Sequence, residues 1–477
     1  MFDVAIIGGG VVGAMVARSV AAYDVKLCII EKENDVAMGA TRANSAIVHA
    51  GFDAKVGTLK AKFNVLGSKM MEKVCSDLGV KYQKNGSLVV GFDETDRETL
   101  KSLLERGNAN GVEGLSLLER EEILKIEPNV GDGVKYALHA PTGAIVCPYE
   151  LAMAGIGNAM DNGAELFLNF EVTKIEKDGD LFAITSQKGE KIYTKYVVNC
   201  AGVYSDSVAK MAGRCDFDVH PRRGEYMLLD NSCKGHVMHT VFCTPSAMGK
   251  GILVSPTVDG NIILGPTAED ITDKADTSTT VDGLASVRAQ AQRNVKNLNF
   301  SKVITSFTGL RSVGSTKDFI INEKDNFINC AGIESPGLTA SPAIGEHVKD
   351  MLIAMGMSDK KRKDHVATRE SLHAFGSMSL EEKQALIQKD ARYAHVICRC
   401  ESVTEGEIVK AITTNPRPND LDGVKRRTRS GMGRCQGGFC TPYVMKLLAE
   451  QRGIAYVDVT KSSENSKILL SRTQKGV

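Results

Sequence analysis

Short apolar runs alternate with longer amphipathic stretches at the start of the chain, which predicts strands alternating with helices. Val4–Ile7 and Leu27–Ile30 are apolar throughout, and the stretch between them, Val11–Ala22, has helical periodicity. Runs without polar positions are typical of strands covered on both faces, as in a parallel sheet. The opening therefore predicts a strand–helix–strand unit and an α/β fold.

The same alternation continues through the first two hundred residues. Further helices are expected at Lys60–Gly79 and Tyr149–Asn162, and a meander of strands within 166–194. Tyr196–Gly202 is a second buried strand that runs into small residues. Such a strand end in a parallel sheet is a frequent ligand-binding position.

The pattern changes at residue 217, where short alternating runs predict an antiparallel sheet with one helix at Val281–Val295. Strands return at Phe319–Asn322 and Phe327–Cys330, and a loop rich in glycine and hydroxyl groups leads to a helix at Ile344–Met355. Residues 357–392 are highly charged and are expected to form a linker with one or two short helices.

These patterns predict three parts, since 477 residues are too many for one hydrophobic core. A discontinuous Rossmann-type domain is expected from residues 1–85, 140–215 and 301–356. A mainly antiparallel α+β substrate-binding domain is expected from 86–139 and 216–300. After the linker, residues 393–477 are expected to form a small C-terminal domain.

The turn after the first strand carries a dinucleotide-binding pattern. Gly8, Gly10 and Gly13 have Gly-x-Gly-x-x-Gly spacing, and Glu31 ends the second strand. Glycines allow the tight turn and the close approach of a pyrophosphate to the helix N-terminus, while an acid at Glu31 can bind a ribose diol. An ordinary glycine turn would leave Glu31 unexplained.

Composition excludes several other classes of function. Lys and Arg number 59 against 58 Asp and Glu, a net charge of +1, so nothing favours nucleic acid or an anionic membrane. No apolar run approaches the roughly 20 residues needed to cross a bilayer. The first strand begins too early to leave room for a signal peptide, so we expect a cytoplasmic protein.

Four of the twelve cysteines cluster near the C-terminus: Cys398, Cys400, Cys435 and Cys440. Four thiolates can hold zinc or an iron–sulfur cluster. The Cys-x-Cys spacing is cramped for a zinc knuckle, and nearby glycines let backbone amides reach inorganic sulfur. This favours a [2Fe–2S] cluster over zinc.

These motifs carry a resemblance to known families. Residues 1–350 resemble the FAD-dependent oxidoreductases of the D-amino-acid oxidase and glycerol-3-phosphate dehydrogenase superfamily, through Gly8–Gly13, the loop Thr41–Gly51 and the loop Gly332–Pro342. The tail resembles the [2Fe–2S] domain of bacterioferritin-associated ferredoxin. The combination is similar to the large subunit of anaerobic glycerol-3-phosphate dehydrogenases.

The resemblance implies FAD and a set of residues that contact it. These are Gly8, Gly10, Gly13, Glu31, Lys32, Thr41, Arg42, Asn44, Ser45, Val172, Ala201, Gly202, Gly337, Leu338 and Thr339.

The reaction is expected to be oxidation of a CH–OH group by the flavin. Arg311 is the candidate for binding a small anionic substrate, because its planar fork matches phosphate or carboxylate. His49 is the candidate proton acceptor. Arg222 and Arg223 can face the active site or solvent, and His239 is a second candidate base.

Three functions stay open at this point. The first is oxidation of glycerol 3-phosphate, with electrons passed through the cluster to a second redox subunit. The second is oxidation of an L-2-hydroxy acid such as L-2-hydroxyglutarate. The loop with Pro336–Ala340 resembles that branch, because the lysine usual in the phosphate users is missing. The third is non-catalytic electron transfer.

Overall fold

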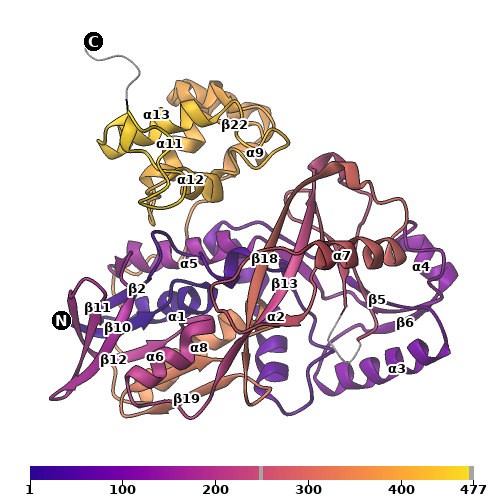
Figure 1. Cartoon of the computed structure of the whole chain (residues 1–477), viewed down its shortest axis with the longest axis horizontal. Helices are drawn as coiled ribbons and strands as arrows, with labels where there is room; N and C mark the ends of the chain where they lie inside the picture. The colour runs from indigo at the N-terminus through magenta and orange to yellow at the C-terminus, as the bar shows by residue number, and fades with distance from the viewer. Residues whose placement is uncertain (246–250, 472–477) are drawn as a thin grey trace.

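The computed structural model describes residues 1–245 and 251–471. Residues 246–250 of the expected substrate-binding domain and 472–477 of the expected C-terminal domain therefore lie outside the described residues. Figure 1 shows two halves side by side, each built on one large sheet, with the C-terminal domain above the first half.

The first sheet is mostly parallel and has the strand order β10-β11-β12-β1-β2-β9, with β20 beside β12 and β19 beside β20. Its strands are β1 (Phe2–Ile7), β2 (Leu27–Ile30), β9 (Glu165–Phe167), β10 (Val172–Asp178), β11 (Leu181–Ser186), β12 (Lys191–Asn199), β19 (Ile320–Lys324) and β20 (Phe327–Ala331). β1 is parallel to both β2 and β12, and its last four residues are buried. The predicted Rossmann-type α/β core is confirmed.

One face of this sheet is covered by helices that pack closely on one another. They are α1 (Val11–Ala21), α2 (Leu59–Leu78), α5 (Pro148–Asp161) and α8 (Gly337–Ala354), while α6 (Ser205–Met211) packs on β10 and β20. Small residues allow the close contacts, because a Cβ at Gly67 of α2 would lie 2.0 Å from the Thr339 carbonyl oxygen of α8.

Helix α8 begins at Gly337, well before Ile344, where we expected it. Its first turns are rich in glycine, serine and threonine, a composition typical of loops. Here those small residues pack against α1 and α2, so burial overrides their low helix propensity.

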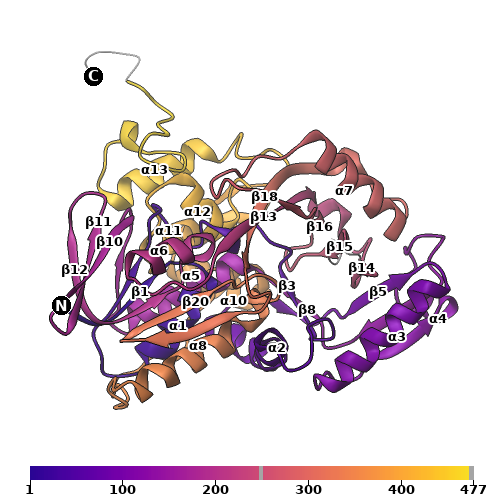
Figure 2. The ribbon, with the colours of Figure 1, turned by 60° about the horizontal axis from the view of Figure 1, so that its bottom comes forward.

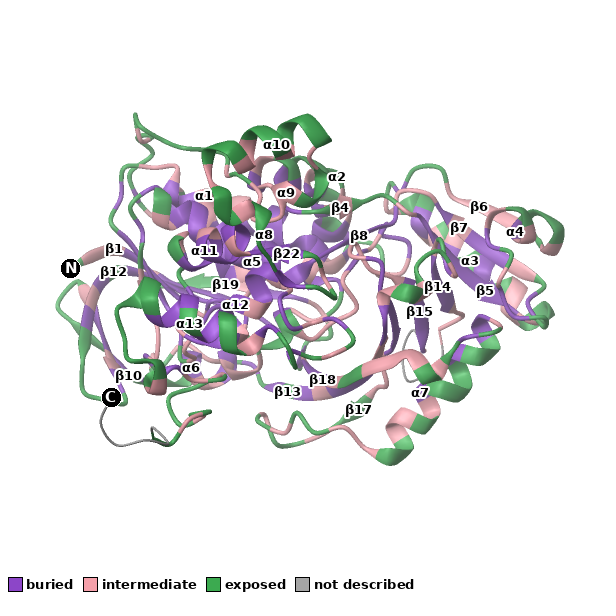
Figure 3. Cartoon of the chain, turned by 90° about the horizontal axis from the view of Figure 1, so that it is seen from above, coloured by how far each residue is buried: buried purple, intermediate pink, exposed green. Residues whose placement is uncertain are grey.

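The second sheet is mainly antiparallel, with the order β17-β13-β16-β15-β14-β5-β7-β6. Its strands are β5 (Ser87–Gly91), β6 (Ser116–Glu119), β7 (Tyr136–Ala140), β13 (Val219–Leu229), β14 (Thr240–Cys243), β15 (Leu253–Pro256), β16 (Ile262–Gly265), β17 (Glu269–Asp270) and β18 (Val303–Gly314). Helices α3 (Glu94–Ala109), α4 (Arg120–Ile126) and α7 (Val281–Asn294) cover it, and Figure 3 shows exposed residues on the outer side of α7.

Strand β18 pairs with β13 along its length, from Val219 opposite Gly314 to Leu229 opposite Val303. We expected residues 301–356 in the first domain, but this part of the range belongs to the second sheet. β18 thereby carries residues such as Arg311 from the second sheet towards the first. A small sheet of β3 (Ile47–Val48), β8 (Ala144–Val146) and β4 (Tyr82–Gln83) lies between the two.

The linker contains α9 (Ala374–Ser377) and α10 (Leu380–Lys389). The C-terminal domain contains β21 (Val396–Cys398), β22 (Val403–Thr404), α11 (Glu405–Thr413), α12 (Leu421–Thr428) and α13 (Thr441–Arg452) around its own apolar core. Figures 1 and 2 show this domain, in yellow, seated on the half that contains the first sheet. Across the described residues, no helix is both long and apolar enough to cross a membrane.

Candidate functional site

A cavity of about 1260 Å³ opens at the carboxyl ends of β1, β2 and β12 and extends to the second sheet. Strand ends of this kind are the usual binding edge of an open α/β sheet. The predicted residues that line it are Gly8, Gly10, Glu31, Lys32, Thr41, Arg42, Asn44, Ser45, His49, Val172, Ala201, Gly202, Arg311, Gly337 and Leu338. Gly13 and Thr339 lie behind its wall.

The glycine turn shapes the cavity floor. Gly8 has φ +113°, and a Cβ there would lie 2.3 Å from the Cys200 carbonyl oxygen. A Cβ at Gly13 would lie 2.1 Å from the Gly8 carbonyl oxygen, so this glycine serves packing between helix and strand. At the start of α1, the Val11 amide donates to Thr41 Oγ1 over 2.9 Å. The turn leaves backbone amides beside the cavity, which fits a pyrophosphate.

Glu31 lies at the end of β2, as predicted, and is buried. Its Oε2 accepts a hydrogen bond from the Gly9 amide at 2.7 Å, and its Oε1 accepts one from the Glu33 amide at 3.0 Å. Burial raises the pKa of Glu31, although both amides oppose that effect. The side chain is thus fixed at the cavity edge, where it can accept hydrogen bonds from a ribose.

The loop after β2 is held by its own side chains. Asn44 Nδ2 donates to the Thr41 carbonyl oxygen at 2.9 Å, and its Oδ1 accepts from the Ala46 amide at 2.8 Å. Ser45 Oγ lies 3.2 Å from the Tyr226 hydroxyl of the second sheet. Asn44 therefore shapes the loop, and Ser45 joins the two halves of the cavity wall.

His49 is braced from two sides. Its amide donates to Thr339 Oγ1 at 2.9 Å, and its carbonyl oxygen accepts from Asn64 Nδ2 at 2.9 Å. Its Nε2 lies 3.5 Å from Ser335 Oγ, and its ring lies 5.8 Å from that of Phe242. Thr339 therefore supports the site indirectly: it holds the backbone of His49 and does not itself line the cavity.

Arg311 enters the cavity from β18, directly opposite Arg222 of β13. Its Nη2 donates to the Thr267 carbonyl oxygen at 3.0 Å, and no carboxylate of the described residues forms an ion pair with it. Arg222, by contrast, is bound by Asp270 through two contacts of 2.6 and 3.0 Å. Arg311 is therefore the guanidinium at this end of the cavity that can accept an anion.

Two residues considered from sequence lie elsewhere. Arg223 points to the other face of β13, where it pairs with Asp276 and Glu269. His239 does not line the cavity; its Nδ1 lies 3.3 Å from the buried Glu127 carboxylate. The structure thus offers no support for His239 as a second base at this site.

Sequence reasoning missed two cavity features. Lys60 of α2 and Glu334 form a half-buried ion pair of 2.6 Å in the wall. Tyr226 stacks on Phe307 with ring centres 4.9 Å apart. The alternation of β13 was the available signal for Tyr226, because it lies four residues beyond Arg222 and so faces the same side.

The four C-terminal cysteines converge as two pairs. Cys398 lies beside Cys440, and Cys400 lies beside Cys435, close enough for the two thiols of each pair to shift each other's pKa. The backbones of Gly431 and Glu401 lie beside the Cys398 sulfur. Two pairs match the two irons of a binuclear cluster, each held by two cysteines.

A single-ion site is not formed, because no group of three or more His, Cys, Asp or Glu side chains in residues 1–245 and 251–471 converges on one point. The glycines around the pairs are required by geometry. Gly431 and Gly437 have φ +91° and +88°, and a Cβ at Gly433 would lie 2.4 Å from Cys400 Cβ. These residues fit a [2Fe–2S] cluster better than zinc.

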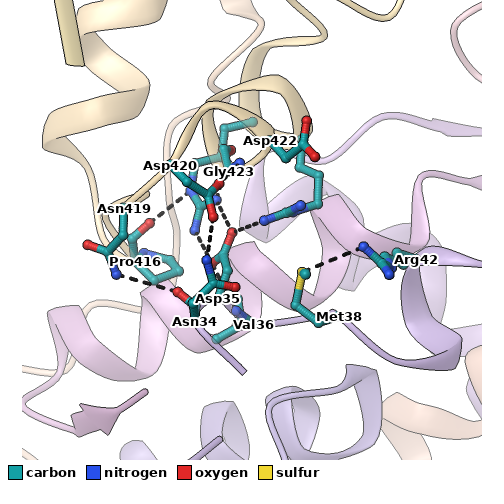
Figure 4. Close-up of polar contacts among 12 residues, drawn as sticks. Asn34, Asp35, Val36, Met38, Arg42, Pro416, Asn419, Asp420, Asp422 and Gly423 are labelled. Atoms are coloured by element: carbon teal, nitrogen blue, oxygen red, sulfur yellow. Dashed lines mark hydrogen bonds and ion pairs between the residues drawn. The ribbon is translucent and has the colours of Figure 1, made fainter. Parts of the chain in front are cut away.

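A buried ionic contact fixes the C-terminal domain to the loop that follows β2 (Figure 4). Asp35 accepts hydrogen bonds from Arg426 Nη2 at 2.6 Å and from both terminal nitrogens of Arg427 at 2.7 Å. Asn34 donates to the Asp420 carboxylate beside them. The contact lies on the segment between Glu31 and Thr41, so the cavity wall and the C-terminal domain share one loop.

A second contact reaches the other half of the molecule. Arg429 donates to Glu401 at 2.8 Å, to Asp259 at 2.7 Å and to Asn261 at 3.0 Å. Glu401 adjoins Cys400, whereas Asp259 and Asn261 lie in the turn between β15 and β16. The C-terminal domain thus contacts both sheets.

The fold and the cavity define a dinucleotide-dependent oxidoreductase with an attached iron–sulfur domain. The chain belongs to the FAD dependent oxidoreductase family, whose model matches residues 3–351, and residues 396–450 match the BFD-like [2Fe-2S] binding domain. Its cofactors are therefore FAD and a [2Fe–2S] cluster.

Individual relatives agree with this assignment. The chain is 46% identical over its whole length to a glycerol 3-phosphate dehydrogenase of Caloramator mitchellensis, covering 100% of both. It is 34% identical to a bovine mitochondrial L-2-hydroxyglutarate dehydrogenase, over 56% of this chain and 61% of that one. Among solved structures, the FAD-bound L-α-glycerophosphate oxidase of Mycoplasma pneumoniae aligns with a TM-score of 0.74 and 33% identity, over 77% of this chain and 98% of that one.

Proposed function

We propose that this chain is an FAD-dependent dehydrogenase that oxidises glycerol 3-phosphate to dihydroxyacetone phosphate. The observation that carries the proposal is Arg311, a cavity guanidinium without a carboxylate partner among the described residues. The full-length similarity to the Caloramator relative supports this substrate over other small anions.

Each side of the cavity has a role in the proposal. Arg311 binds the phosphate through its fork, and Tyr226 and Ser45 orient the glycerol hydroxyls. His49, held by Thr339 and Asn64, takes the proton of the hydroxyl being oxidised. FAD supplies the two-electron acceptor for the hydrogen on the same carbon.

Residues of the first sheet would hold the FAD in this proposal. The Gly8–Gly10 turn and the start of α1 would bind its pyrophosphate, and Glu31 would accept hydrogen bonds from its ribose. The N-terminus of α8, at Gly337 and Leu338, would present its positive dipole end to the flavin, although the Gly337 amide itself donates to the Glu334 carbonyl oxygen. Cys398, Cys400, Cys435 and Cys440 would hold the [2Fe–2S] cluster, which would supply one-electron transfer to a separate redox partner.

The second candidate is an L-2-hydroxy acid dehydrogenase. The specific observation in its favour is that Arg311 can bind a carboxylate as well as a phosphate, and that the loop at Pro336–Leu338 has no lysine to add a second cation. The third candidate, non-catalytic electron transfer, would not explain why Thr339 and Asn64 hold His49 in place at the cavity.

A substrate panel tests the proposal. Under anaerobic conditions, glycerol 3-phosphate should bleach the flavin absorbance within seconds, whereas L-2-hydroxyglutarate and glycine should leave it oxidised. Bleaching by L-2-hydroxyglutarate alone would transfer the assignment to the second candidate. If none of the three bleached a flavin that dithionite reduces, the dehydrogenase proposal would fail.

A further inference from the structure

The aromatic side chains that are exposed to solvent in the described part of the chain lie together in the C-terminal domain. Within the described residues, the exposed aromatic side chains are Phe439, Tyr443 and Tyr456, which are 76%, 56% and 40% exposed. All three surround the N-terminus of α13, and the Tyr456 hydroxyl donates to the Pro442 carbonyl oxygen at 3.3 Å. Exposed aromatics gathered in one place are typical of protein-binding surfaces.

This aromatic group lies at the cluster ligands. Phe439 directly precedes Cys440 and lies four residues after Cys435. Cys400 is exposed and Cys435 is half-buried, whereas Cys398 and Cys440 are buried. The side of the cluster held by Cys400 and Cys435 therefore faces the molecular surface beside the aromatic side chains.

Unpaired cations flank the same two cysteines. Arg399 and Arg434 precede Cys400 and Cys435 and are exposed, and neither forms an ion pair with another described residue. Glu401, next to Cys400, is engaged by Arg429, and Asp230 lies near Arg434 without forming an ion pair with it. The exposed edge of the cluster thus carries two arginines outside ion pairs.

We propose that the surface formed by Arg399, Arg434, Phe439 and Tyr443 docks an acidic one-electron carrier protein, which takes electrons from the cluster. This inference rests on the proposed function, because it specifies the kind of protein that accepts the enzyme's electrons. Aromatic side chains provide the desolvated centre of such an interface, and the arginines attract an acidic partner and set its orientation. Each substrate oxidised releases two electrons, so two carriers are reduced by one electron each and two protons go to solvent.

The test uses the holoenzyme with two probes of opposite charge. Cytochrome b5 is an acidic one-electron carrier, and cytochrome c is a basic one. With glycerol 3-phosphate as donor, the wild type should reduce cytochrome b5 faster than cytochrome c at low salt, and the advantage should fall as salt rises. The Kd for cytochrome b5, measured without substrate, should follow the same trend.

Charge-reversal variants distinguish docking at this surface from an effect of the protein's overall charge. Arg399→Glu with Arg434→Glu should slow cytochrome b5 reduction roughly 10- to 100-fold and weaken its Kd by a similar factor. The matched control is Lys188→Glu with Lys324→Glu, an equal charge change at exposed residues in the turn between β11 and β12 and at the end of β19, and it should change both values less than twofold. Phe439→Ser with Tyr443→Ser should weaken binding roughly tenfold or more.

Two further readouts keep the outcomes distinct. The visible spectrum must show that each variant retains its cluster, and a small dye that accepts electrons from flavin must be reduced at the wild-type rate. Equal reduction of cytochrome b5 by wild type and both surface variants would overturn the inference, as would wild-type enzyme that reduces the dye but neither carrier. Failure to reduce even the dye would instead count against the proposed function.

Discussion

Asp35 is the side chain whose removal should loosen the C-terminal domain most. It is 2% exposed, and its carboxylate is the one partner that both Arg426 and Arg427 share, with contacts of 2.6 to 2.7 Å. Asp35→Ala would leave two buried guanidinium groups facing each other across an empty position.

The magnitude follows from the cost of leaving a buried charge unpaired. Removing one partner of a buried ion pair destabilises by about 3–5 kcal/mol. We expect the lower end, because Arg427 keeps hydrogen bonds to the carbonyl oxygens of Pro416 and Gly423, both at 2.9 Å.

The pKa of Asp35 reflects the same interaction. Burial alone would raise it, but Arg427 and Arg426 outweigh burial and lower the pKa of Asp35 from 3.8 to about 2. At about 1.4 kcal/mol per unit, the ionised carboxylate gains roughly 2–3 kcal/mol from the folded contact. Both routes give the same order of magnitude.

Two assays measure the effect. Denaturant unfolding monitored by flavin fluorescence and by cluster absorbance should show one shared transition in the wild type. In Asp35→Ala the cluster absorbance should be lost before the flavin fluorescence changes. The free energy of unfolding of the C-terminal domain should be about 3 kcal/mol lower than in the wild type. Limited proteolysis should cut the exposed linker faster and release the C-terminal domain. Arg427→Met, which removes the other partner, should have a similar effect.

The control is Asp180→Ala, which removes an exposed carboxylate in the turn after β10 and should change stability by less than about 0.5 kcal/mol. The opposite outcome is an Asp35→Ala variant that unfolds in one transition, with the free energy of the control, while it retains wild-type FAD content. Such a result would mean that the buried ionic contact does not hold the domain in place.

Three other predictions follow from particular residues. The folded-state pKa of Asp35 lies below its unfolded value, so its contribution to stability is complete above about pH 4 and is lost as pH falls towards 2. Proteolysis of the linker by an acid-active protease should therefore rise over that range in the wild type. In Asp35→Asn the rate of proteolysis should stay flat. Arg311→Met should raise the KM for glycerol 3-phosphate by roughly 100-fold, the loss of a charged hydrogen bond of about 2–3 kcal/mol, and an unchanged KM would remove Arg311 from the site. Gly433→Ala should abolish cluster absorbance, since its Cβ would lie 2.4 Å from Cys400 Cβ, whereas Gly376→Ala, with open space around it, should retain the cluster.

Local patterns were enough to predict the core of the molecule. The glycines between Gly8 and Gly13, the apolar run before them and Glu31 all lie within one strand–helix–strand unit, where spacing fixes geometry. Within each cysteine motif, Cys398–Cys400 and Cys435–Cys440, the spacing was equally local, so sequence alone could locate both motifs. Which cysteine of one motif lies beside which of the other became visible only in the structure.

Long-range features were not accessible in the same way. The start of α8 was misplaced, because its small residues look like a loop until α1 and α2 are packed against them. The pairing of Asp35 with Arg426 and Arg427 joins residues almost 400 positions apart, and no pattern in either segment indicates the other. Which of Arg222 and Arg223 faces the cavity could not be decided until the partner strands of β13 were known.

The proposed function requires electrons from glycerol 3-phosphate to pass from the flavin to the cluster within this one chain. Anaerobic addition of glycerol 3-phosphate, without any acceptor, can show this transfer when flavin absorbance is recorded together with the low-temperature EPR spectrum. Flavin absorbance should fall, and the signal of a reduced [2Fe–2S] cluster should appear. A bleached flavin beside a cluster that stays oxidised, although dithionite reduces it, would mean that electrons do not follow this path.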